Sequence, residues 1–412
     1  MRIAALALLV VLAGDDALRA AEAGALVLRP ATVDQFYVEP DAPARLEWSV
    51  PGGQTPAALA YRICDLWGRQ EAAGEAAVAG GVVALDVTLR RGYHEIEFPA
   101  AERRFGIVAL PPAGDAADPF FAIDSALSWL VADEGVREGL VKALRRSGIR
   151  MSRERVRWGQ VNPAKDRWQW DEGGRYDTLR QCYARHGVSI LEMFHDAPAH
   201  LGRSGRYPVD LIGAAEGVQR IVRQWQATWG ALEIWNEPEI SFGGEYPADQ
   251  YVSLLKALLC GAERERLSVP VVAGVFAHYL EEYVTCAARN GILQCADAIS
   301  FHTYDRAERM EALVGSYRSW LERSGREGLP LWLTECGRPW RRGPDRPPLD
   351  QDRESALDIT MKAVEAKACG IARYFAFVYP FYEENANNFG MACRAGTPLG
   401  CMAAYAQAAA AL

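Results

Sequence analysis

Two hydrophobic patterns divide the chain, and they meet near residue 117. From about residue 25, short runs of alternating apolar and polar residues are separated by Pro and Gly, with almost no helical periodicity. Such alternation is typical of strands that bury one face. The clearest runs cover residues 44–50, 81–89 and 93–98. We therefore predict a small antiparallel β-sandwich domain over residues 24–117, ending in a Pro- and Gly-rich linker at residues 111–115.

After Asp118, short apolar runs without alternation are each followed by a longer amphipathic segment. The runs begin near Phe120, Ile149, Val188, Leu232, Pro270, Ala298, Leu331 and Ala372. The amphipathic segments include residues 134–146, 214–229, 249–266 and 352–368, which we expect to be helices. Eight strand-then-helix repeats with buried strands predict an α/β fold, a (β/α)8 TIM barrel over residues 118–412. A doubly wound sheet is the rival fold, but no G-x-G-x-x-G motif follows any of the runs.

The N-terminus has the features of an export signal. Arg2 supplies a positive charge, residues 3–13 form an apolar run, and Ala21-Glu22-Ala23 resembles an A-x-A cleavage site. We expect residues 1–23 to be a signal peptide, with cleavage at Ala20 as the alternative because Asp15 and Asp16 make the region atypical, and the mature protein to be periplasmic or secreted. The apolar run is too short to span a bilayer, so no membrane partner is expected.

Composition excludes some classes of protein and leaves the cysteines open. The formal net charge of −8 argues against a nucleic-acid or anionic-membrane partner. Nine cysteines leave at least one unpaired. Cys286 with Cys295, and Cys393 with Cys401, are candidate disulfides in an oxidising compartment. Burial as small apolar side chains is the alternative, and it suits Cys260 and Cys369 on predicted helices.

The sequence carries no motif for a metal, a cofactor or a serine nucleophile. It contains neither H-E-x-x-H nor a pair of C-x-x-C motifs, which would indicate a zinc site. It also lacks the G-x-S-x-G motif of serine hydrolases. We therefore expect chemistry that uses only side chains.

Two glutamates follow the fourth and seventh apolar runs. Glu237 belongs to a W-N-E-P segment at residues 235–238, and Glu335 belongs to a T-E segment at residues 334–335. Active-site residues of such barrels come from the C-terminal ends of the strands, and strands 4 and 7 lie across the barrel mouth. Two carboxylates that converge there on a bound sugar can cleave a glycosidic bond.

These segments, with F-H-T-Y at residues 301–304 on the sixth strand, resemble the clan A glycoside hydrolases, and families 39 and 5 are the most similar. The resemblance covers the barrel. It implies a retaining hydrolase that cleaves O-glycosidic, β-linked bonds of an oligo- or polysaccharide by double displacement. By position, Glu237 corresponds to the acid/base and Glu335 to the nucleophile.

The same resemblance implies roles for neighbouring side chains. Asn236 would hydrogen-bond the sugar 2-hydroxyl, Tyr304 would donate a hydrogen bond to Glu335, and His302 would lie near the acid/base or the substrate. A non-catalytic carbohydrate-binding protein on the same barrel is the alternative. Such a protein would be expected to have lost one glutamate, and both are present.

The second strand contains arginines that fit two explanations. Arg153 stands five residues before Trp158 and resembles the clan arginine that helps to keep the nucleophile ionised. Arg155 has the same strand parity and could also point inward. Alternatively, these arginines pair with Glu192 and Glu233, carboxylates inside strands 3 and 4 that would otherwise be buried charges.

Three further residues are candidates for contact with the sugar. His195 closes the third strand, where related enzymes present a His to the sugar, and a structural role is the alternative. Trp340 and Tyr379 follow strands 7 and 8, and we expect their rings to stack on sugar faces. The clan usually has a Trp at the end of strand 8, but residues 374–379 contain none.

Overall fold

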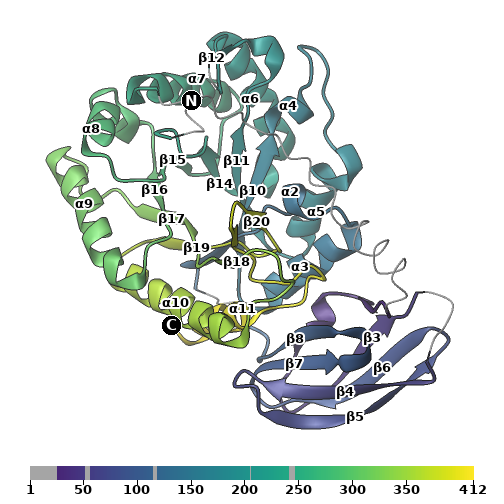
Figure 1. Cartoon of the computed structure of the whole chain (residues 1–412). Helices are drawn as coiled ribbons and strands as arrows, with labels where there is room; N and C mark the ends of the chain where they lie inside the picture. Colours follow the sequence, from purple (N-terminus) through teal and green to yellow (C-terminus); the bar gives the residue numbers. More distant parts are fainter. Residues whose placement is uncertain (1–25, 52–55, 115–117, 205, 241–245) are drawn as a thin grey trace. The chain divides into compact units, whose positions relative to one another are not determined.

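The computed structural model describes residues 26–51, 56–114, 118–204, 206–240 and 246–412 (Figure 1). The predicted signal peptide, residues 1–23, lies outside these ranges. The chain divides into two compact units, of which the first ends at Ala109 and the second begins at Leu110. The linker predicted at residues 111–115 therefore falls at the start of the second unit. Among the helices of the described ranges, none is long and apolar enough to cross a membrane.

The first unit is built of β-strands around an aromatic core. Its strands are β1 (Arg29–Pro30), β2 (Tyr37–Val38), β3 (Pro43–Ser49), β4 (Ala58–Asp65), β5 (Gln70–Ala79), β6 (Val82–Thr88), β7 (Gly92–Phe98) and β8 (Arg103–Ala109). They pair in the order β1-β3-β6-β5-β4-β7-β8-β2, antiparallel except for β2 with β8. The Trp48 ring of β3 lies 5.0 Å from Phe98 of β7 and 5.5 Å from Phe105 of β8. The two ends of the sheet therefore face each other, as the predicted sandwich requires.

Eight parallel strands of the second unit close into a barrel. They are β9 (Phe121–Asp124), β10 (Met151–Arg157), β11 (Ser189–His195), β14 (Trp229–Ile234), β15 (Val271–Phe276), β16 (Ala298–Thr303), β17 (Leu331–Cys336) and β19 (Arg373–Phe377). Each pairs with the next in chain order, and β19 pairs with β9 to complete the ring. Each predicted run overlaps one of these strands, although β14 begins three residues before Leu232, so the predicted TIM barrel is confirmed.

Helices surround the barrel in the chain order that the sequence predicts (Figure 1). They are α3 (Glu134–Arg146), α5 (Asp177–Arg185), α6 (Leu211–Trp225), α7 (Ala248–Arg264), α8 (Glu281–Arg289), α9 (Met310–Arg323), α10 (Leu349–Ala368) and α11 (Gly400–Ala411), with the short α2 (Leu127–Leu130) after β9 and α4 (Trp158–Val161) after β10. The bounds predicted for the helix over residues 214–229 were wrong, because α6 begins at Leu211 and ends at Trp225. Asp210 caps α6 by accepting a hydrogen bond from the Gly213 amide at 2.8 Å, and Trp229 already belongs to β14.

The barrel interior changes from apolar to charged along the strands. One layer consists of Ala122, Met151, Leu191, Ala231, Val272, Ala298, Trp332 and Phe375, all buried. Two residues further along β9, β10 and β14, the same strand faces carry Asp124, Arg153 and Glu233. The apolar layer therefore supports a charged layer nearer the carboxyl ends of the strands, where barrel enzymes have their active sites.

Short strands follow the last two barrel strands. They form a small antiparallel sheet that consists of β18 (Trp340–Arg341), β20 (Glu383–Glu384) and β21 (Asn387–Asn388). A separate pair, β12 (Arg203–Ser204) and β13 (Tyr207–Pro208), follows β11.

All nine cysteines are free thiols, so neither candidate disulfide is formed. Instead of bonding to Cys401, the Cys393 sulfur lies 3.0 Å from the Thr397 hydroxyl. The alternative of buried apolar side chains describes Cys393 and Cys401 correctly. It is wrong for Cys260, which is exposed on α7, and Cys369 is only partly buried.

Candidate active site

The segment after β14 holds Glu237 in an unusual backbone conformation. Trp235 and Glu237 both have positive φ angles, 74° and 42°. The Glu237 amide donates a hydrogen bond to the Val275 carbonyl of β15 at 3.0 Å, and the Trp235 ring is fully buried against Tyr207. Positive φ costs a non-glycine residue roughly 1–3 kcal/mol and persists where the surroundings enforce it. The fold therefore fixes the direction in which the Glu237 carboxyl points.

The carboxyl groups of Glu237 and Glu335 converge on His302. A carboxyl oxygen of each glutamate and a ring nitrogen of His302 all lie within 4.8 Å of one another. His302 Nδ1 is 2.9 Å from Glu237 Oε1 and 3.7 Å from Glu335 Oε2. Burial lowers the pKa of His302, but the charges of Glu335 and Glu237 outweigh it and raise that pKa. His302 therefore bridges two carboxylates from opposite sides of the barrel mouth.

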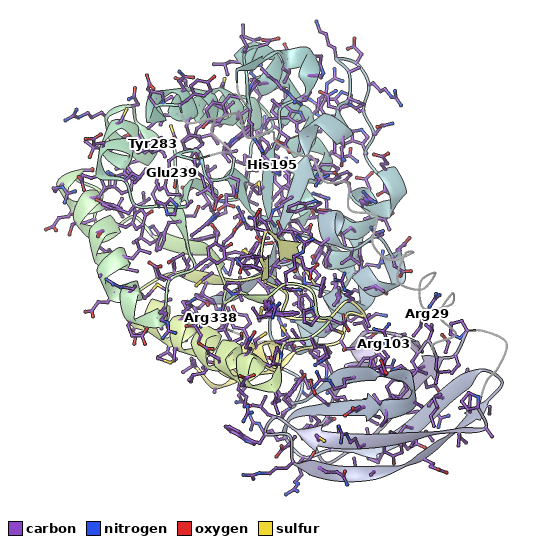
Figure 2. All side chains as sticks on the ribbon, viewed as in Figure 1. Arg29, Arg103, His195, Glu239, Tyr283 and Arg338 are labelled. Atoms are coloured by element: carbon purple, nitrogen blue, oxygen red, sulfur yellow. The ribbon has the colours of Figure 1, made fainter. Side chains whose placement is uncertain are left out.

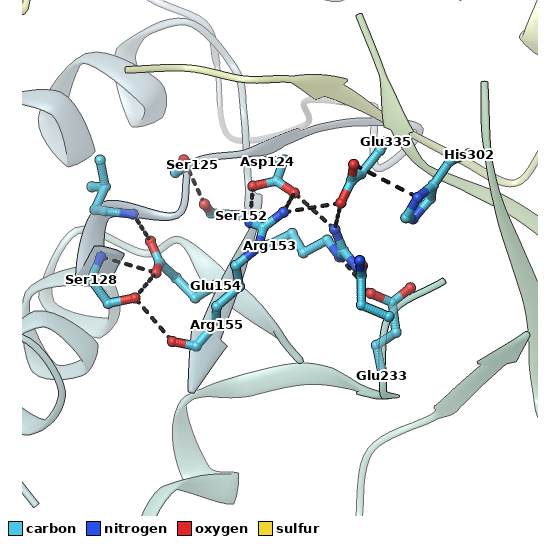
Figure 3. A network of polar contacts seen from close by, with 12 residues as sticks. Asp124, Ser125, Ser128, Ser152, Arg153, Glu154, Arg155, Glu233, His302 and Glu335 are labelled. Atoms are coloured by element: carbon cyan, nitrogen blue, oxygen red, sulfur yellow. Dashed lines mark hydrogen bonds and ion pairs between the residues drawn. The ribbon is translucent and has the colours of Figure 1, made fainter. Parts of the chain in front are cut away.

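Glu335 is surrounded by arginines and His302, which Figure 3 shows, and by a hydroxyl donor, Tyr304. Its Oε1 accepts hydrogen bonds from Arg153 and, at 3.0 Å, from Arg155, while the Tyr304 hydroxyl donates to Oε2 at 2.8 Å. Burial raises the pKa of Glu335, but His302 and the two arginines outweigh it and bring the pKa to about 2. The Glu335 carboxylate is therefore ionised across the physiological pH range.

Arg153 joins carboxylates from three other strands (Figure 3). Besides Glu335, its guanidinium contacts Asp124 at 2.9 Å and Glu233, and it donates to the Asn236 side-chain oxygen at 2.8 Å. The pairing of Arg153 with Glu233 is confirmed, and Arg153 also makes the contact with Glu335 that the role implied by the resemblance requires. The bond to Asn236 leaves the amide nitrogen of that side chain for another partner.

The proposed partner for Glu192 was wrong. Glu192 forms an ion pair with Arg180 of α5 at 2.6 Å and accepts a hydrogen bond from Trp229 at 2.9 Å. Its strand parity is opposite to that of Glu233, since Met193 of β11 is the residue aligned with Glu233. Glu192 therefore points to the helix layer and Glu233 into the barrel.

Alternate residues of β10 point out of the barrel and form hydrogen bonds with uncharged donors and acceptors, not ion pairs (Figure 3). Glu154 is fully buried and accepts hydrogen bonds from the Leu127 amide, the Ser128 hydroxyl and the Tyr183 hydroxyl, each at 2.7 Å. Ser152 donates to Ser125 at 2.7 Å. This outward set confirms that Arg153 and Arg155 share the inward face of the strand.

His195 lies at the end of β11, next to β10. Its Nδ1 is 2.9 Å from an Asp196 carboxyl oxygen. Burial lowers the pKa of His195 and outweighs the opposite effect of Asp196. His195 is therefore a neutral imidazole at the rim of the barrel, close in the sheet to Arg157, with which it aligns.

The stacking predicted for Trp340 and Tyr379 does not agree with their positions. Tyr379 has no exposed surface, and Trp340 is 5% exposed, with its indole nitrogen donating to the Gly390 carbonyl at 3.2 Å. Both rings pack beneath the loops that follow β17 and β19, so neither offers a face to a sugar.

Aromatic rings that the sequence did not single out surround Tyr304, the hydroxyl donor to Glu335. The ring of Tyr304, 36% exposed, lies 5.6 Å from Phe377 at the end of β19 and 5.3 Å from Phe389. Trp129 of α2 lies 5.5 Å from Tyr382. Phe377 is the last residue of β19, the eighth barrel strand, where the clan usually has a Trp. An expectation of any aromatic residue at the end of this strand, in place of Trp alone, would have identified Phe377 from the sequence.

Glu239 is a further acidic residue beside the pair (labelled in Figure 2). Its side chain is 8% exposed, and one carboxyl oxygen accepts a hydrogen bond from the His278 amide at 2.6 Å. The other oxygen is buried without a hydrogen-bond partner among the residues that the structure describes. Burial raises the pKa of Glu239 to about 7, and the charge of Glu237 adds to this effect.

We expect Glu239→Gln to stabilise the protein increasingly as the pH rises. A carboxyl whose folded-state pKa is raised stabilises the fold below its unfolded pKa, and that contribution is lost as the pH rises from about 4.5 to about 7. The amide cannot ionise, so the variant should match the wild type near pH 5 and exceed its free energy of unfolding by roughly 3 kcal/mol at pH 8.

Urea denaturation at several pH values measures the difference. The exposed Glu327→Gln is the control, and its effect should not depend on pH. A Glu239→Gln effect that is equally independent of pH would contradict the prediction.

The Glu237, His302 and Glu335 atoms are close enough together to resemble a metal site. However, Glu335 already contacts two guanidinium groups, Arg153 and Arg155. A divalent cation added there would be repelled by both arginines, so the electrostatics disfavour a metal ion between these carboxylates.

A parallel (β/α)8 barrel with two close carboxyls at the ends of strands 4 and 7 is the arrangement of a glycoside hydrolase. The family model described as glycosyl hydrolase catalytic core matches residues 213–403, a segment that contains both glutamates. Over residues 213–403 the chain is therefore similar to a glycosyl hydrolase catalytic core. A search of curated protein sequences found no match.

Solved structures of clan A enzymes share the fold. A family 39 glycoside hydrolase from Bacteroides cellulosilyticus WH2 matches with a TM-score of 0.73 and 16% identity, covering 93% of this chain and 83% of that one. A family 39 β-xylosidase from Caulobacter crescentus matches with a TM-score of 0.56 and 19% identity, over 72% and 71%. A subfamily 18 member of family 5 from Streptomyces cattleya, in complex with Manβ1-4GlcNAc, matches with a TM-score of 0.58 and 14% identity, over 71% and 80%.

Proposed function

We propose that this protein hydrolyses glycosidic bonds with retention of anomeric configuration. One observation carries the proposal: carboxyl oxygens of Glu237 and Glu335 lie within 4.8 Å of each other. Retaining enzymes hold their carboxyls about 5–5.5 Å apart, whereas inverting enzymes need roughly 6.5–9.5 Å to admit a water molecule. The separation is therefore too short for the inverting reaction.

In the proposed reaction, the Glu335 carboxylate attacks the anomeric carbon and the bond to the leaving oxygen breaks. Glu237 gives its proton to that oxygen, then removes a proton from the water that attacks the same carbon and releases Glu335. Two features support this assignment of roles to the two glutamates. The pKa of Glu335 is about 2, which suits a nucleophile, and His302 Nδ1 contacts Glu237 at 2.9 Å and can orient its carboxyl.

Asn236 is proposed to bind the sugar 2-hydroxyl. Arg153 fixes the side-chain oxygen of Asn236, so the amide nitrogen faces away from Arg153 as a donor. A hydrogen bond to the 2-hydroxyl strengthens as positive charge develops at the anomeric centre. Arg153, Arg155 and Tyr304 are proposed to hold Glu335 ionised and in position, without contacting the sugar.

We further propose an oligo- or polysaccharide with β-linked sugars as the substrate. The support is the likeness to a β-xylosidase and to a protein bound to Manβ1-4GlcNAc. A panel of aryl β-glycosides and β-linked polysaccharides tests this choice. Hydrolysis of α-linked members alone would overturn it.

Covalent trapping tests the mechanism. The protein is incubated with the 2-fluoro analogue of its best aryl glycoside, and intact mass spectrometry followed by peptide mapping locates the adduct. We expect one fluoroglycosyl group on Glu335 and none on the Glu335→Gln variant. An active enzyme that forms no adduct on Glu335 would remove it as the nucleophile.

Glu237→Gln should slow the reaction according to the leaving group. Loss of a general acid costs typically 10²–10⁴-fold where the leaving oxygen needs a proton. We therefore expect kcat/KM to fall in that range for a disaccharide, but only a few-fold for a dinitrophenyl glycoside, whose leaving group departs unprotonated. Comparing the two substrates measures the effect, and equal losses on both would contradict the acid/base role.

Export is proposed from the N-terminal sequence alone. N-terminal sequencing of protein recovered from the periplasm or medium of an expressing bacterium should begin at Gly24, or at Ala21 if cleavage follows Ala20. An intact Met1 on protein found only in the cytoplasm would overturn the proposal.

A further inference from the structure

Three arginines share the inward face of β10 at increasing distance from the apolar layer. Arg153 and Arg155 are both buried, and both form ion pairs with Glu335 and Asp124. Arg157 is the last residue of the strand and has the same parity. It lies two residues, roughly 6–7 Å, further toward the barrel mouth than Arg155. Arg157 is therefore next to the space above the nucleophile.

Arg157 differs from the other two in forming no ion pair with any residue that the structure describes. The structure describes no carboxylate within ion-pair distance of its guanidinium, among the ranges given above, and no hydrogen bond from that group. Its side chain is nevertheless half-buried. Asp124 pairs with Arg153 and Arg155, and Asp196 pairs with His195 at 2.9 Å and with Arg206 at 3.5 Å. The charge of Arg157 also lowers the pKa of Asp196, but from beyond ion-pair distance.

An aromatic ring holds the Arg157 guanidinium in place. It lies 5.1 Å from the ring centre of Trp129, whose other ring contact is Tyr382. Trp129 follows strand 1 and Tyr382 follows strand 8, so both belong to loops at the carboxyl end of the barrel. A cation–π contact orients an arginine without neutralising its charge. Arg157 is therefore a positioned, partly desolvated cation that still has all its donors available.

We propose that Arg157 binds an anionic group on the substrate, either the carboxylate of a uronic acid or a sulfate ester. The inference rests on the proposed function, since it names the class of sugar that this same site takes. A guanidinium presents paired donors that match two oxygens of either anion. Such a ligand would supply the close countercharge that Asp124 and Glu335 supply to Arg153 and Arg155, whereas Asp196 acts on Arg157 only from beyond ion-pair distance.

Equilibrium binding tests the proposal without requiring turnover. Glu335→Gln protein is titrated with a set of oligosaccharides of hexuronic acids, each compared with the same oligosaccharide after reduction of its carboxylates to alcohols. A second set compares sulfated oligosaccharides with their desulfated forms. We expect at least one anionic member to bind about tenfold or more tightly than its neutral counterpart, with an affinity that falls as salt is added.

Variants then assign the effect to Arg157. In the same background, Arg157→Gln should weaken binding of the preferred anionic oligosaccharide by roughly 10- to 100-fold. Arg264→Gln is the matched control, because it removes the same charge from the exposed end of α7, at the opposite end of the barrel. The control should leave the affinity unchanged, and Arg157→Lys should restore only part of it because an ammonium cannot bind bidentately.

The outcomes separate this inference from the proposed function. Preference within the carboxylate set or the sulfate set identifies which anion is bound. If every anionic member binds no better than its neutral counterpart, or if Arg157→Gln and Arg264→Gln have equal effects, the inference is overturned. Hydrolysis is assayed independently with the wild-type protein, so an enzyme that cleaves only neutral glycosides would overturn the inference and leave the hydrolase function standing.

Discussion

Replacing Glu335 with Gln is expected to lower kcat/KM by about 10⁴-fold or more, because the variant has no carboxylate to attack the anomeric carbon. The amide can still accept a hydrogen bond from Tyr304, so the fold should survive. The measurement is the rate of release of an aryl leaving group, with circular dichroism to verify folding. The exposed Glu322→Gln is the control and should retain full activity.

A second variant separates loss of the nucleophile from loss of structure. Glu335→Ala opens space beside the anomeric carbon, and azide can enter to attack it in place of the carboxylate. Azide should restore turnover and yield a glycosyl azide of inverted configuration, since only one displacement then occurs. If Glu335→Gln retains more than a tenth of the activity, or azide gives a product of retained configuration, Glu335 is not the nucleophile.

Arg153→Met should lower the free energy of unfolding by about 3–5 kcal/mol at neutral pH. The change leaves Glu233, which pairs with Arg153 through its guanidinium, as a buried charge without that partner, and it removes one of two guanidinium contacts from Asp124 and Glu335. Breaking a buried ion pair from one side costs this much because the remaining charge stays desolvated. Urea denaturation measures the loss.

The double variant Arg153→Met/Glu233→Gln distinguishes charge from packing. It removes the orphaned carboxylate, so it should recover a substantial part of the lost stability. Arg264→Met, at the exposed end of α7, should change the free energy of unfolding by no more than about 0.5 kcal/mol. A loss below 1 kcal/mol for Arg153→Met, or no recovery in the double variant, would contradict the electrostatic explanation.

The two predictions concern one network, which links stability to chemistry. Arg153 contacts Asn236, Glu233, Asp124 and Glu335 at once, so the groups proposed to bind the sugar and to attack it share one cation. A buried ion network of this kind fixes geometry more than it adds stability. We therefore expect variants of Arg153 to lose activity even where they remain folded.

The amino-acid sequence by itself determined the fold class and the position of the two glutamates along it. Apolar runs without alternation, each followed by an amphipathic segment, indicate buried parallel strands covered by helices. A strand with both faces buried needs apolar side chains at successive positions, whereas a half-exposed strand alternates. In such a barrel, Glu237 and Glu335 necessarily reach the same end of the ring, since all strands run in one direction. Strand parity likewise placed Arg153 and Arg155 on one face.

Only the tertiary structure decided which side chains meet. Glu192 and Glu233 are both acids inside strands, yet one turns to Arg180 and the other to Arg153, because the register between β11 and β14 sets their parity. Burial of Trp340 and Tyr379, and the position of Trp129 beside Arg157, depend on loops whose course follows from packing between distant segments. Local sequence encodes strand direction and periodicity, whereas these contacts join residues far apart in the chain, so they exist only once the barrel has closed.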